Sequence, residues 1–145
     1  KNKKNYQKSQ GNMGHLLLRP IGQQILADAV GSLVSKGSSL EAIFKKLEKV
    51  DNAGQFNAHL PQSIFYGVTV DIEGKRMLTT NQLEAAKYLE YLLAGEADNK
   101  RQIKYLDQII EKRSDPTDPE KWINFDGSIT LKSNKDKIYL PKPFI

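Results

Sequence analysis

Residues 16–50, LLLRPIGQQILADAVGSLVSKGSSLEAIFKKLEKV, decide the fold class of this chain. After Pro20, apolar residues recur at spacings of three and four, which places them on one face of an amphipathic helix. These residues are Ile21, Ile25, Leu26, Ala29, Val30, Leu33 and Val34. Proline suits the first position of a helix, because the N–H that it lacks would have no partner there. The pattern predicts a helix over residues 20–36, with Gly37 just beyond its end.

A second helix is predicted to follow almost at once. Ser38 and Glu41 have the spacing of a capping box, in which each side chain bonds a backbone N–H at the start of the helix. The apolar stripe that follows consists of Leu40, Ile43, Phe44, Leu47 and Val50. Because only two or three residues join the two helices, the sequence predicts a packed helical hairpin.

Two more helices are predicted in the second half of the chain. Thr79 and Gln82 form another capping box, and the helix behind it carries an apolar stripe of Leu83, Ala86, Tyr88, Leu89, Leu92 and Leu93. Asp98 suits the N-cap of a fourth helix. Lys112 and Arg113 would lie in its last turn, where cations interact favourably with the negative end of the helix dipole.

Short extended segments complete the prediction. Residues 16–18 are typical of a buried strand, and residues 64–70 have the β-branched and aromatic content of a second one. A turn at 71–74 would let residues 76–78 pair with it as a two-stranded ribbon.

Nearer the end of the chain, prolines interrupt every pattern. Residues 118–120 are predicted to form a single helical turn that brings Trp122 into the core. Residues 129–131 and 138–140 are predicted to be extended. The whole is a mainly α fold with a small β-ribbon (α+β): about four amphipathic helices, a helical hairpin and short strands.

The amino terminus differs in composition from the rest. Residues 1–14 have no apolar period and are predicted to be a flexible basic tail. Residues 15–145 are predicted to form one helical domain. Because the chain opens with Lys1 rather than Met, we expect it to be the carboxy-terminal part of a longer protein.

Composition excludes several classes of protein. Hydrophobic residues make up 39% and charged residues 27% of the 145 residues, which is typical of a globular domain. Cysteine is absent, so there are no disulfides and no thiolate chemistry. The longest apolar runs fall far short of the ~20 residues that span a bilayer. These features favour a cytoplasmic protein without a membrane partner.

The net charge of +5 is unevenly distributed. Residues 1–19 contain five Lys and Arg residues and no acid, whereas residues 20–97 contain seven bases and nine acids. A basic tail gains affinity for nucleic acid when it neutralises phosphates. The same tail is equally consistent with a polar leader that binds nothing.

No catalytic motif is visible. The two histidines, His15 and His59, lack neighbours at metal-ligand spacing, and we expect both in loops or at the surface. Carboxylates that a nuclease metal site would need fall in turns: Asp71 and Glu73, then Asp115, Asp118 and Glu120. Turn formation and helix capping account for them. The sequence predicts neither an enzyme nor a bound cofactor or metal.

Nucleic-acid binding is the more reasonable expectation, and ten basic residues are its candidates. Lys3, Lys4 and Lys8 lie in the tail, and Arg19 lies just before the first helix. Lys45, Lys46 and Lys49 lie on the second helix, and Lys100, Arg101 and Lys104 on the fourth. The tight turn before the second helix is similar to that of a helix–turn–helix. Each cluster is also consistent with a solvated helix face.

One stretch resembles a known family. The run Leu16–Gln23, followed by two helices, residues 64–66, residues 75–78 and a helix containing residues 91–93, is similar to the carboxy-terminal half of DGQHR-domain proteins. That family includes the DndB-type proteins of bacterial DNA sulfur modification (phosphorothioation). The likeness covers roughly residues 16–95. The Asp-Gly-Gln-His-Arg signature itself does not occur in this sequence, so no functional residue of the signature transfers to this chain.

The resemblance implies a role linked to DNA, such as regulation, including transcription regulation, or service to a modification or defence cassette. We therefore expect a non-catalytic accessory domain that binds double-stranded DNA or another protein of the same cassette. The alternative is a protein-interaction or oligomerisation module without a nucleic-acid role. In that case Tyr88, Tyr91 and Tyr105 would supply an apolar patch.

Overall fold

The structure is a computed structural model that describes residues 15–72, 76–94, 108–109, 111–133 and 141–144. It is an α+β fold with three α-helices and one antiparallel sheet of three strands among these residues. The count of about four helices is therefore one too high for the described part. Most of the predicted fourth helix lies outside the described residues, and so does the predicted tail over 1–14.

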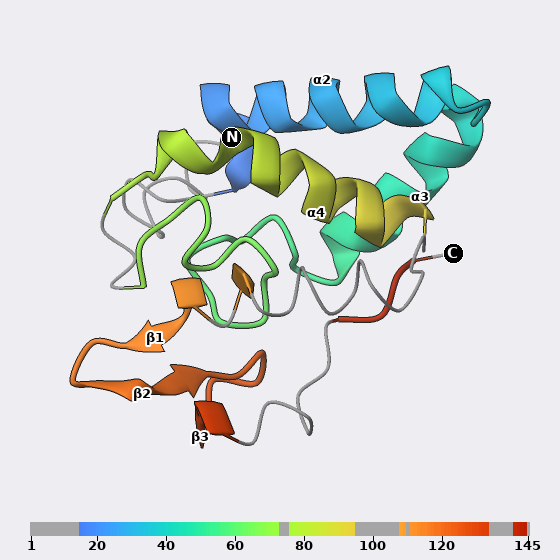
Figure 1. Ribbon diagram of the computed structural model, residues 1–145. Coiled ribbons are helices and arrows are strands. Elements are labelled where there is room, and N and C mark those ends of the chain that lie inside the picture. Colours follow the sequence, from blue (N-terminus) through green and yellow to red (C-terminus); the bar gives the residue numbers. More distant parts are fainter. Residues whose placement is uncertain (1–14, 73–75, 95–107, 110, 134–140, 145) are drawn as a thin grey trace, which may run out of the picture.

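The three helices occupy one end of the molecule, and the small sheet lies at the opposite end (Figure 1). Helix α2 (Pro20–Ser35) packs along α4 (Gln82–Ala94), while α3 (Leu40–Asn52) turns away from α2 after a short loop. The prediction that α2 and α3 pack together as a helical hairpin is thus wrong, because α2 packs mainly against α4. Hydrogen bonds join the two helices: Gln82 of α4 donates to Asp28 of α2 at 3.3 Å, and Ser32 of α2 donates to Glu90 of α4 at 3.0 Å.

The predicted strand over residues 16–18 is instead a short 3-10 helix, η1 (Leu16–Leu18). The His15 ring accepts a hydrogen bond from the Leu17 N–H at 3.1 Å, which caps this turn. Gly22 of α2 lies directly against η1, where an added Cβ would come within 1.9 Å of the Leu16 carbonyl oxygen. Only glycine allows this close approach of the two backbones.

Helix α3 begins one residue later than predicted. Ser39, not Ser38, is the N-cap, and its hydroxyl accepts from the Ala42 N–H at 3.2 Å. Ile43, Leu47 and Val50 are buried as expected. The other two members of the predicted stripe are 51% exposed (Leu40) and 56% exposed (Phe44), because α3 leaves the α2 layer at this corner.

Residues 63–70 are continuously buried but do not form the predicted strand. They fold into successive turns with isolated bridges between Tyr66 and Val70 and between Val70 and Met77. Gly67 has a φ of 78°, and an added Cβ would lie 2.5 Å from the Lys112 carbonyl oxygen. The left-handed backbone and the close neighbour rule out an extended strand here. The Leu78 N–H does bond the Thr69 carbonyl at 2.7 Å, so the return of the chain is as predicted.

Helix α4 is tied in place at both ends. It follows a 3-10 turn, η2 (Thr79–Asn81). The predicted capping box does not form, because Thr79 lies inside η2 and the Gln82 side chain donates to the Asp28 carboxylate at 3.3 Å. Asn81 instead donates to the Val68 carbonyl at 2.9 Å. At the other end, the Phe144 N–H donates to the Leu92 carbonyl at 2.7 Å. The carboxy-terminal segment thus supplies a partner for a carbonyl that the helix itself leaves unpaired.

The sheet is built from β1 (Ser114–Asp115), β2 (Asp118–Ile123) and β3 (Ile129–Leu131) in that order. The predicted helical turn at 118–120 is wrong, because this segment pairs with β1 as a strand. Trp122 is buried as predicted, and the extended segment at 129–131 is confirmed as β3. Residues 138–140 lie outside the described part.

Arg113 connects the sheet to the helical layer. Its side chain is fully buried, and it donates hydrogen bonds to the carbonyls of Pro61 (2.6 Å), Ser63 (3.0 Å), Ile123 (2.8 Å) and Asn124 (2.9 Å). No described carboxylate pairs with it. Arg113 does lie at the end of a helical segment as predicted, since its N–H bonds the Ile109 carbonyl at 3.0 Å. Its side chain, however, is buried and bonds carbonyls of other segments rather than those at the end of its own helix.

No helix within the described ranges combines the length and the apolar character that crossing a bilayer requires.

The position of the α3 cap can be tested with neighbouring serines. Ser39→Ala should lower the free energy of unfolding by about 1 kcal/mol, because the Ala42 N–H loses its acceptor. Ser38→Ala should change it by less than about 0.5 kcal/mol. Urea denaturation of both variants measures the difference, and equal losses would contradict Ser39 as the cap.

Removing the buried guanidinium of Arg113 should lower the free energy of unfolding by more than removing the Ser39 cap does. Arg113→Met removes the donor of four carbonyls, which are buried or partly buried, so we expect the free energy of unfolding to fall by at least about 3 kcal/mol. Arg76→Met, at an exposed arginine, is the matched control and should cost less than about 0.5 kcal/mol. Denaturant titration compares the two, and a loss below about 1 kcal/mol for Arg113→Met would refute its structural role.

Candidate nucleic-acid interface

Four of the ten predicted basic residues lie within the described structure: Arg19, Lys45, Lys46 and Lys49. The other six, Lys3, Lys4, Lys8, Lys100, Arg101 and Lys104, lie outside it. The candidate interface is therefore built on α3, which carries three of the four.

Helix α3 has one buried face and one basic face. Its buried residues anchor it to the core, and the three lysines project from the remaining surface. Lys45 is 3.4 Å from the Glu41 carboxylate, one helical turn away. Lys46 and Lys49 form no ion pair with any described residue. The cations available to an external anion are therefore Lys46 and Lys49 rather than Lys45.

Acidic residues on the same helix limit this basic character. Three lysines are matched by Glu41, Glu48 and Asp51. Asp51 is already engaged, because its carboxylate lies 2.6 Å from the His15 Nε2 atom. The remaining acids would repel a nearby phosphate, so α3 can offer a few phosphate contacts but not a continuous positive surface.

The contact between His15 and Asp51 also positions Arg19. It places the carboxyl end of α3 beside η1, the segment that leads to Arg19 and α2. The Leu16 N–H bonds the Phe56 carbonyl at 2.8 Å and fixes the same junction. The chain thus enters the described fold at His15, next to the end of α3 that carries Lys49.

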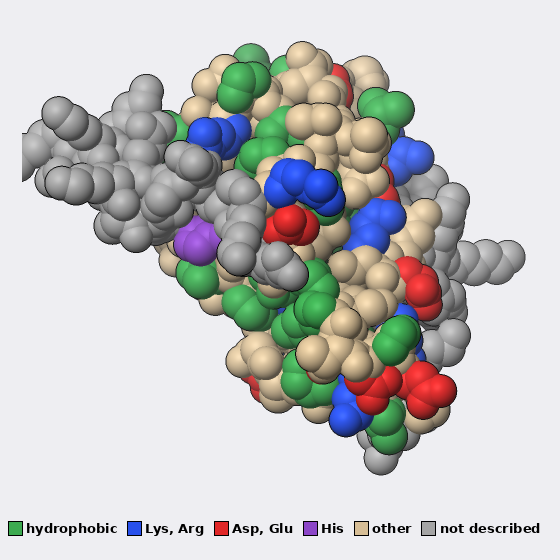
Figure 2. All heavy atoms as spheres, turned by 90° about the vertical axis from the view of Figure 1, so that its left-hand side faces the viewer, with side chains coloured by type: hydrophobic (Ala, Val, Ile, Leu, Met, Phe, Trp, Pro, Cys, Tyr) green, Lys and Arg blue, Asp and Glu red, His purple; other side chains and the backbone are tan. Residues whose placement is uncertain are grey.

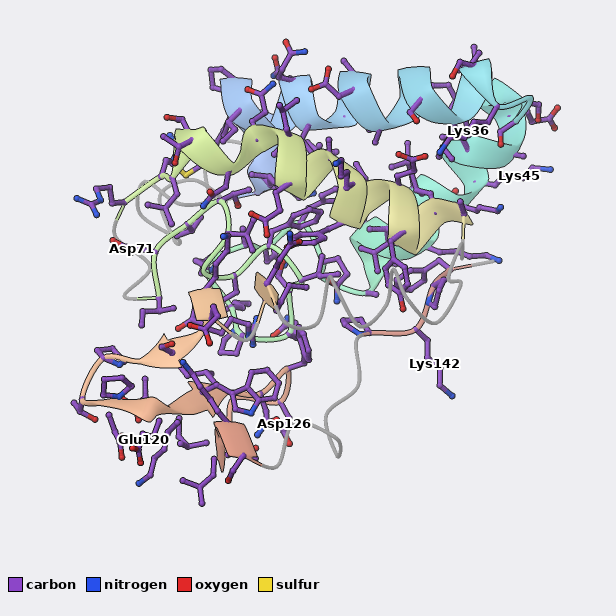
Figure 3. All side chains as sticks on the ribbon, viewed as in Figure 1. Lys36, Lys45, Asp71, Glu120, Asp126 and Lys142 are labelled. Atoms are coloured by element: carbon purple, nitrogen blue, oxygen red, sulfur yellow. The ribbon has the colours of Figure 1, made fainter. Side chains whose placement is uncertain are left out.

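Charged side chains are distributed unequally over the molecule (Figure 3). Lys36 and Lys45 lie at the end where α2 meets α3, and Glu120 and Asp126 lie at the sheet end. Lys36 is paired with Glu90 of α4. On the face shown in Figure 2, acidic and basic side chains of the described residues are interspersed, without a large patch of either sign. Figure 2 thus shows no continuous basic patch on its face, and the case for α3 rests on Lys46 and Lys49, which form no ion pair with a described residue.

The two histidines differ in their contacts. His15 caps η1 and packs its ring 5.4 Å from that of Phe56. His59 has its Nδ1 atom buried without a hydrogen-bond partner, and burial lowers the pKa of its ring. Among the residues that the structure describes, no three His, Asp or Glu side chains are grouped so as to hold a metal ion.

Asp71, Asp115 and Asp118 accept local hydrogen bonds at turns, as expected, whereas Glu120 lies within β2 and Glu73 lies outside the described residues. The Asp115 carboxylate accepts from the Thr117 N–H at 2.9 Å, and Asp118 accepts from the Glu120 N–H at 3.1 Å. The hydrogen bonds from Thr117 lower the pKa of Asp115. Asp71 accepts from the Arg76 N–H at 3.3 Å. These contacts use the carboxylates as local acceptors within the chain.

Apolar surface lies elsewhere than the sequence predicted. Tyr88 and Tyr91 are buried, so they cannot form the expected patch, and Tyr105 lies outside the described residues. Large apolar side chains are instead exposed at the α2–α3 corner (Val34, Leu40 and Phe44), on the sheet (Ile129 and Leu131) and near the start of α4, where Leu83 of the predicted stripe is 73% exposed. The sequence offered a signal only for the corner, since Leu40 and Phe44 flank the buried stripe.

The burial of His59 predicts a pH effect on stability. Its pKa is lowered in the folded state, so the unfolded chain binds more protons as the pH falls through about 6.5. Stability contributed by the neutral ring is therefore lost on acidification from pH 7 to pH 5. His59→Gln should lose less stability over this range than the parent chain, as measured by urea denaturation at each pH.

The same experiment contains its control. Between pH 8 and pH 9 the ring is neutral in both states, so the two proteins should show the same pH dependence. Parallel curves between pH 7 and pH 5 would contradict the assignment.

Comparison of the chain with protein-family models, with curated proteins and with solved structures finds no match.

Proposed function

We propose that this chain is a non-catalytic accessory domain of a cytoplasmic DNA-modification or defence protein related to the DGQHR and DndB-type family, and that it binds double-stranded DNA. The proposal depends on the observation that Lys46 and Lys49 have no ion-pair partner among the described residues. On α3, Lys49 is exposed and Lys46 is half-buried. An unpaired lysine contacts a phosphate without first losing a carboxylate partner.

A rigid helix strengthens this proposal. Ile43, Leu47 and Val50 are buried on the opposite side of α3, and Ser39 caps its start. The lysines are thus held on a fixed scaffold rather than on a loop. Arg19 lies close along the chain to the His15–Asp51 contact at the end of α3, and the predicted basic tail precedes it.

The expected mode is phosphate contact rather than base reading. Lysine binds phosphates as a point charge, and such contacts carry no sequence information. Glu41 and Glu48 on the same helix reduce the number of favourable contacts. We therefore propose weak, salt-sensitive binding that serves to position the parent protein on DNA.

A non-catalytic role is supported by the described carboxylates and histidines. Asp71, Asp115 and Asp118 accept hydrogen bonds from nearby backbone N–H groups. His15 is engaged with the Leu17 N–H and with Asp51. A general base or a nucleophile would need these groups for the substrate instead.

The exposed corner of α2 and α3 favours the second candidate function, a protein-interaction module. Leu40 and Phe44 lie one helical turn apart and are both more than half exposed. Apolar and aromatic side chains of this kind are typical of interface centres. In this alternative, a partner protein of the same cassette would cover the corner, and DNA would play no part.

The DNA proposal predicts a specific change in salt-dependent binding. The double variant Lys46→Gln/Lys49→Gln should weaken binding to a duplex of any sequence. The slope of log K against log salt concentration should become shallower by about 0.9 for each phosphate that the variant no longer neutralises. Fluorescence anisotropy across a salt series measures both quantities.

The matched control is Arg76→Gln/Lys87→Gln, which removes the same charge from exposed positions away from α3. It should leave the slope within error of the parent chain. Equal effects of the two double variants, or binding that does not depend on salt, would sink the DNA proposal. If Phe44→Lys abolishes capture of a cassette protein while DNA binding is absent, the interaction module is the correct function.

A further inference from the structure

The outer edge of β3 carries open backbone hydrogen-bonding groups, as the register of the sheet shows. Ile129 lies opposite Ile123, Thr130 opposite Trp122 and Leu131 opposite Lys121. The Asn124 N–H donates to the Ser128 carbonyl at 2.8 Å. Hydrogen-bonded pairs alternate along an antiparallel ladder.

It follows that Thr130 is the residue of β3 bonded to β2. The N–H and carbonyl groups of Ile129 and Leu131 point away from β2. The other side of the sheet agrees, because the Ile123 N–H donates to the Arg113 carbonyl at 2.8 Å rather than toward β3. Within the described part of the chain, nothing bonds the outward groups of Ile129 and Leu131.

Apolar side chains accompany this open edge. Ile129 is 48% and Leu131 is 45% exposed. Both lie on the same face of the sheet, opposite to the face of Trp122, since side chains alternate along a strand. Native sheets commonly protect an open edge with a lysine that projects into solvent.

Here the nearest lysine is turned away from the edge. Lys132 donates to the Ser114 hydroxyl at 2.7 Å and lies 3.7 Å from the Glu111 carboxylate. Both partners are on the β1 side of the sheet. The edge of β3 therefore has unpaired backbone groups and exposed apolar side chains, without a lysine directed outward from it.

We propose that β3 pairs antiparallel with β3 of a second copy of this chain, about a two-fold axis at Thr130. In this register Ile129 of one copy lies opposite Leu131 of the other, so both outward-facing residues of each copy exchange backbone hydrogen bonds. The two sheets join into one, with Ile129 and Leu131 of both copies side by side on one face. Such an interface is isologous and closed.

Charge and side-chain pairing favour a second copy as the occupant. Lys132 of one copy lies across from Ser128 of the other, so no like charges are opposed. Thr130 meets Thr130, a favourable cross-strand pair. Because β3 has three residues, the dimer should be weak and depend on protein concentration.

A cysteine scan tests the register directly, because the chain has no cysteine of its own. Thr130→Cys should form a cross-linked dimer on mild oxidation. Directly opposed residues of this pair type have Cβ atoms about 4.5–5.5 Å apart, near the distance that a disulfide needs. Ile129→Cys is the matched control, because it would face Leu131 and should cross-link much less. Equal yields for both variants would overturn the register.

Analytical ultracentrifugation of the full chain tests the association itself. Ile129→Pro removes an outward N–H without removing a bond to β2, so the fold should persist while the dissociation constant rises about tenfold or more. Phe44→Lys, at an exposed apolar residue of α3, should leave it unchanged. A monomer up to millimolar concentration, or a dimer that Phe44→Lys disrupts and Ile129→Pro does not, would overturn the proposal.

Discussion

The guanidinium of Arg113 lies between the aromatic rings of Tyr66 and Phe125, at 4.9 Å and 4.3 Å from their centroids. Taking this cation out of water is costly, and burial lowers its pKa to about 10. Four backbone carbonyls and two ring faces offset the cost through charge–dipole and cation–π attraction. Two of these carbonyls belong to the loop beneath the helices, at Pro61 and Ser63, and the other two are at the end of β2 and just after it. Arg113 therefore joins the sheet to the loop that lies beneath the helices.

The sequence predicted best where the structure depends on local contacts. The extent of α2 follows from periodicity and from Pro20, and the outcome agrees to within one residue. Predictions that needed distant contacts were wrong. Residues 16–18 form a 3-10 turn, because His15 caps it and Gly22 has no Cβ to clash with its backbone. Residues 64–70 form turns rather than a strand, because Gly67 lies against the carbonyl of Lys112. The role of Arg113 could not be predicted, since backbone carbonyls about 50 residues away leave no mark on composition or spacing.

The sequence predicted which basic residues lie on α3, but not which of them form ion pairs. Helical spacing placed Lys45, Lys46 and Lys49 away from the core, and the structure agrees that the opposite side of α3 is buried. Which of them is paired depends on rotamers, and only Lys45 has a described carboxylate within 4 Å. Tyr88 and Tyr91 contact residues that come later in the chain: the Tyr88 hydroxyl donates to Gln108 Oε1 at 3.2 Å, and the Pro141 carbonyl accepts from the Tyr91 hydroxyl at 3.1 Å. Such packing partners are remote in sequence, so a stripe alone could not distinguish core from interface.

The two proposed surfaces lie on different elements: the lysines on α3 and the open edge on β3, at separate ends of the molecule (Figure 1). Pairing through β3 would leave α3 uncovered, so a dimer would present two sets of lysines to one duplex. A few phosphate contacts per copy give weak binding, but linking two copies makes the second contact intramolecular and raises the overall affinity without any new interaction. This gain requires a fixed angle between sheet and helices. Arg113 contributes to that constraint, because its carbonyl partners lie both in the loop beneath the helices and at the end of β2.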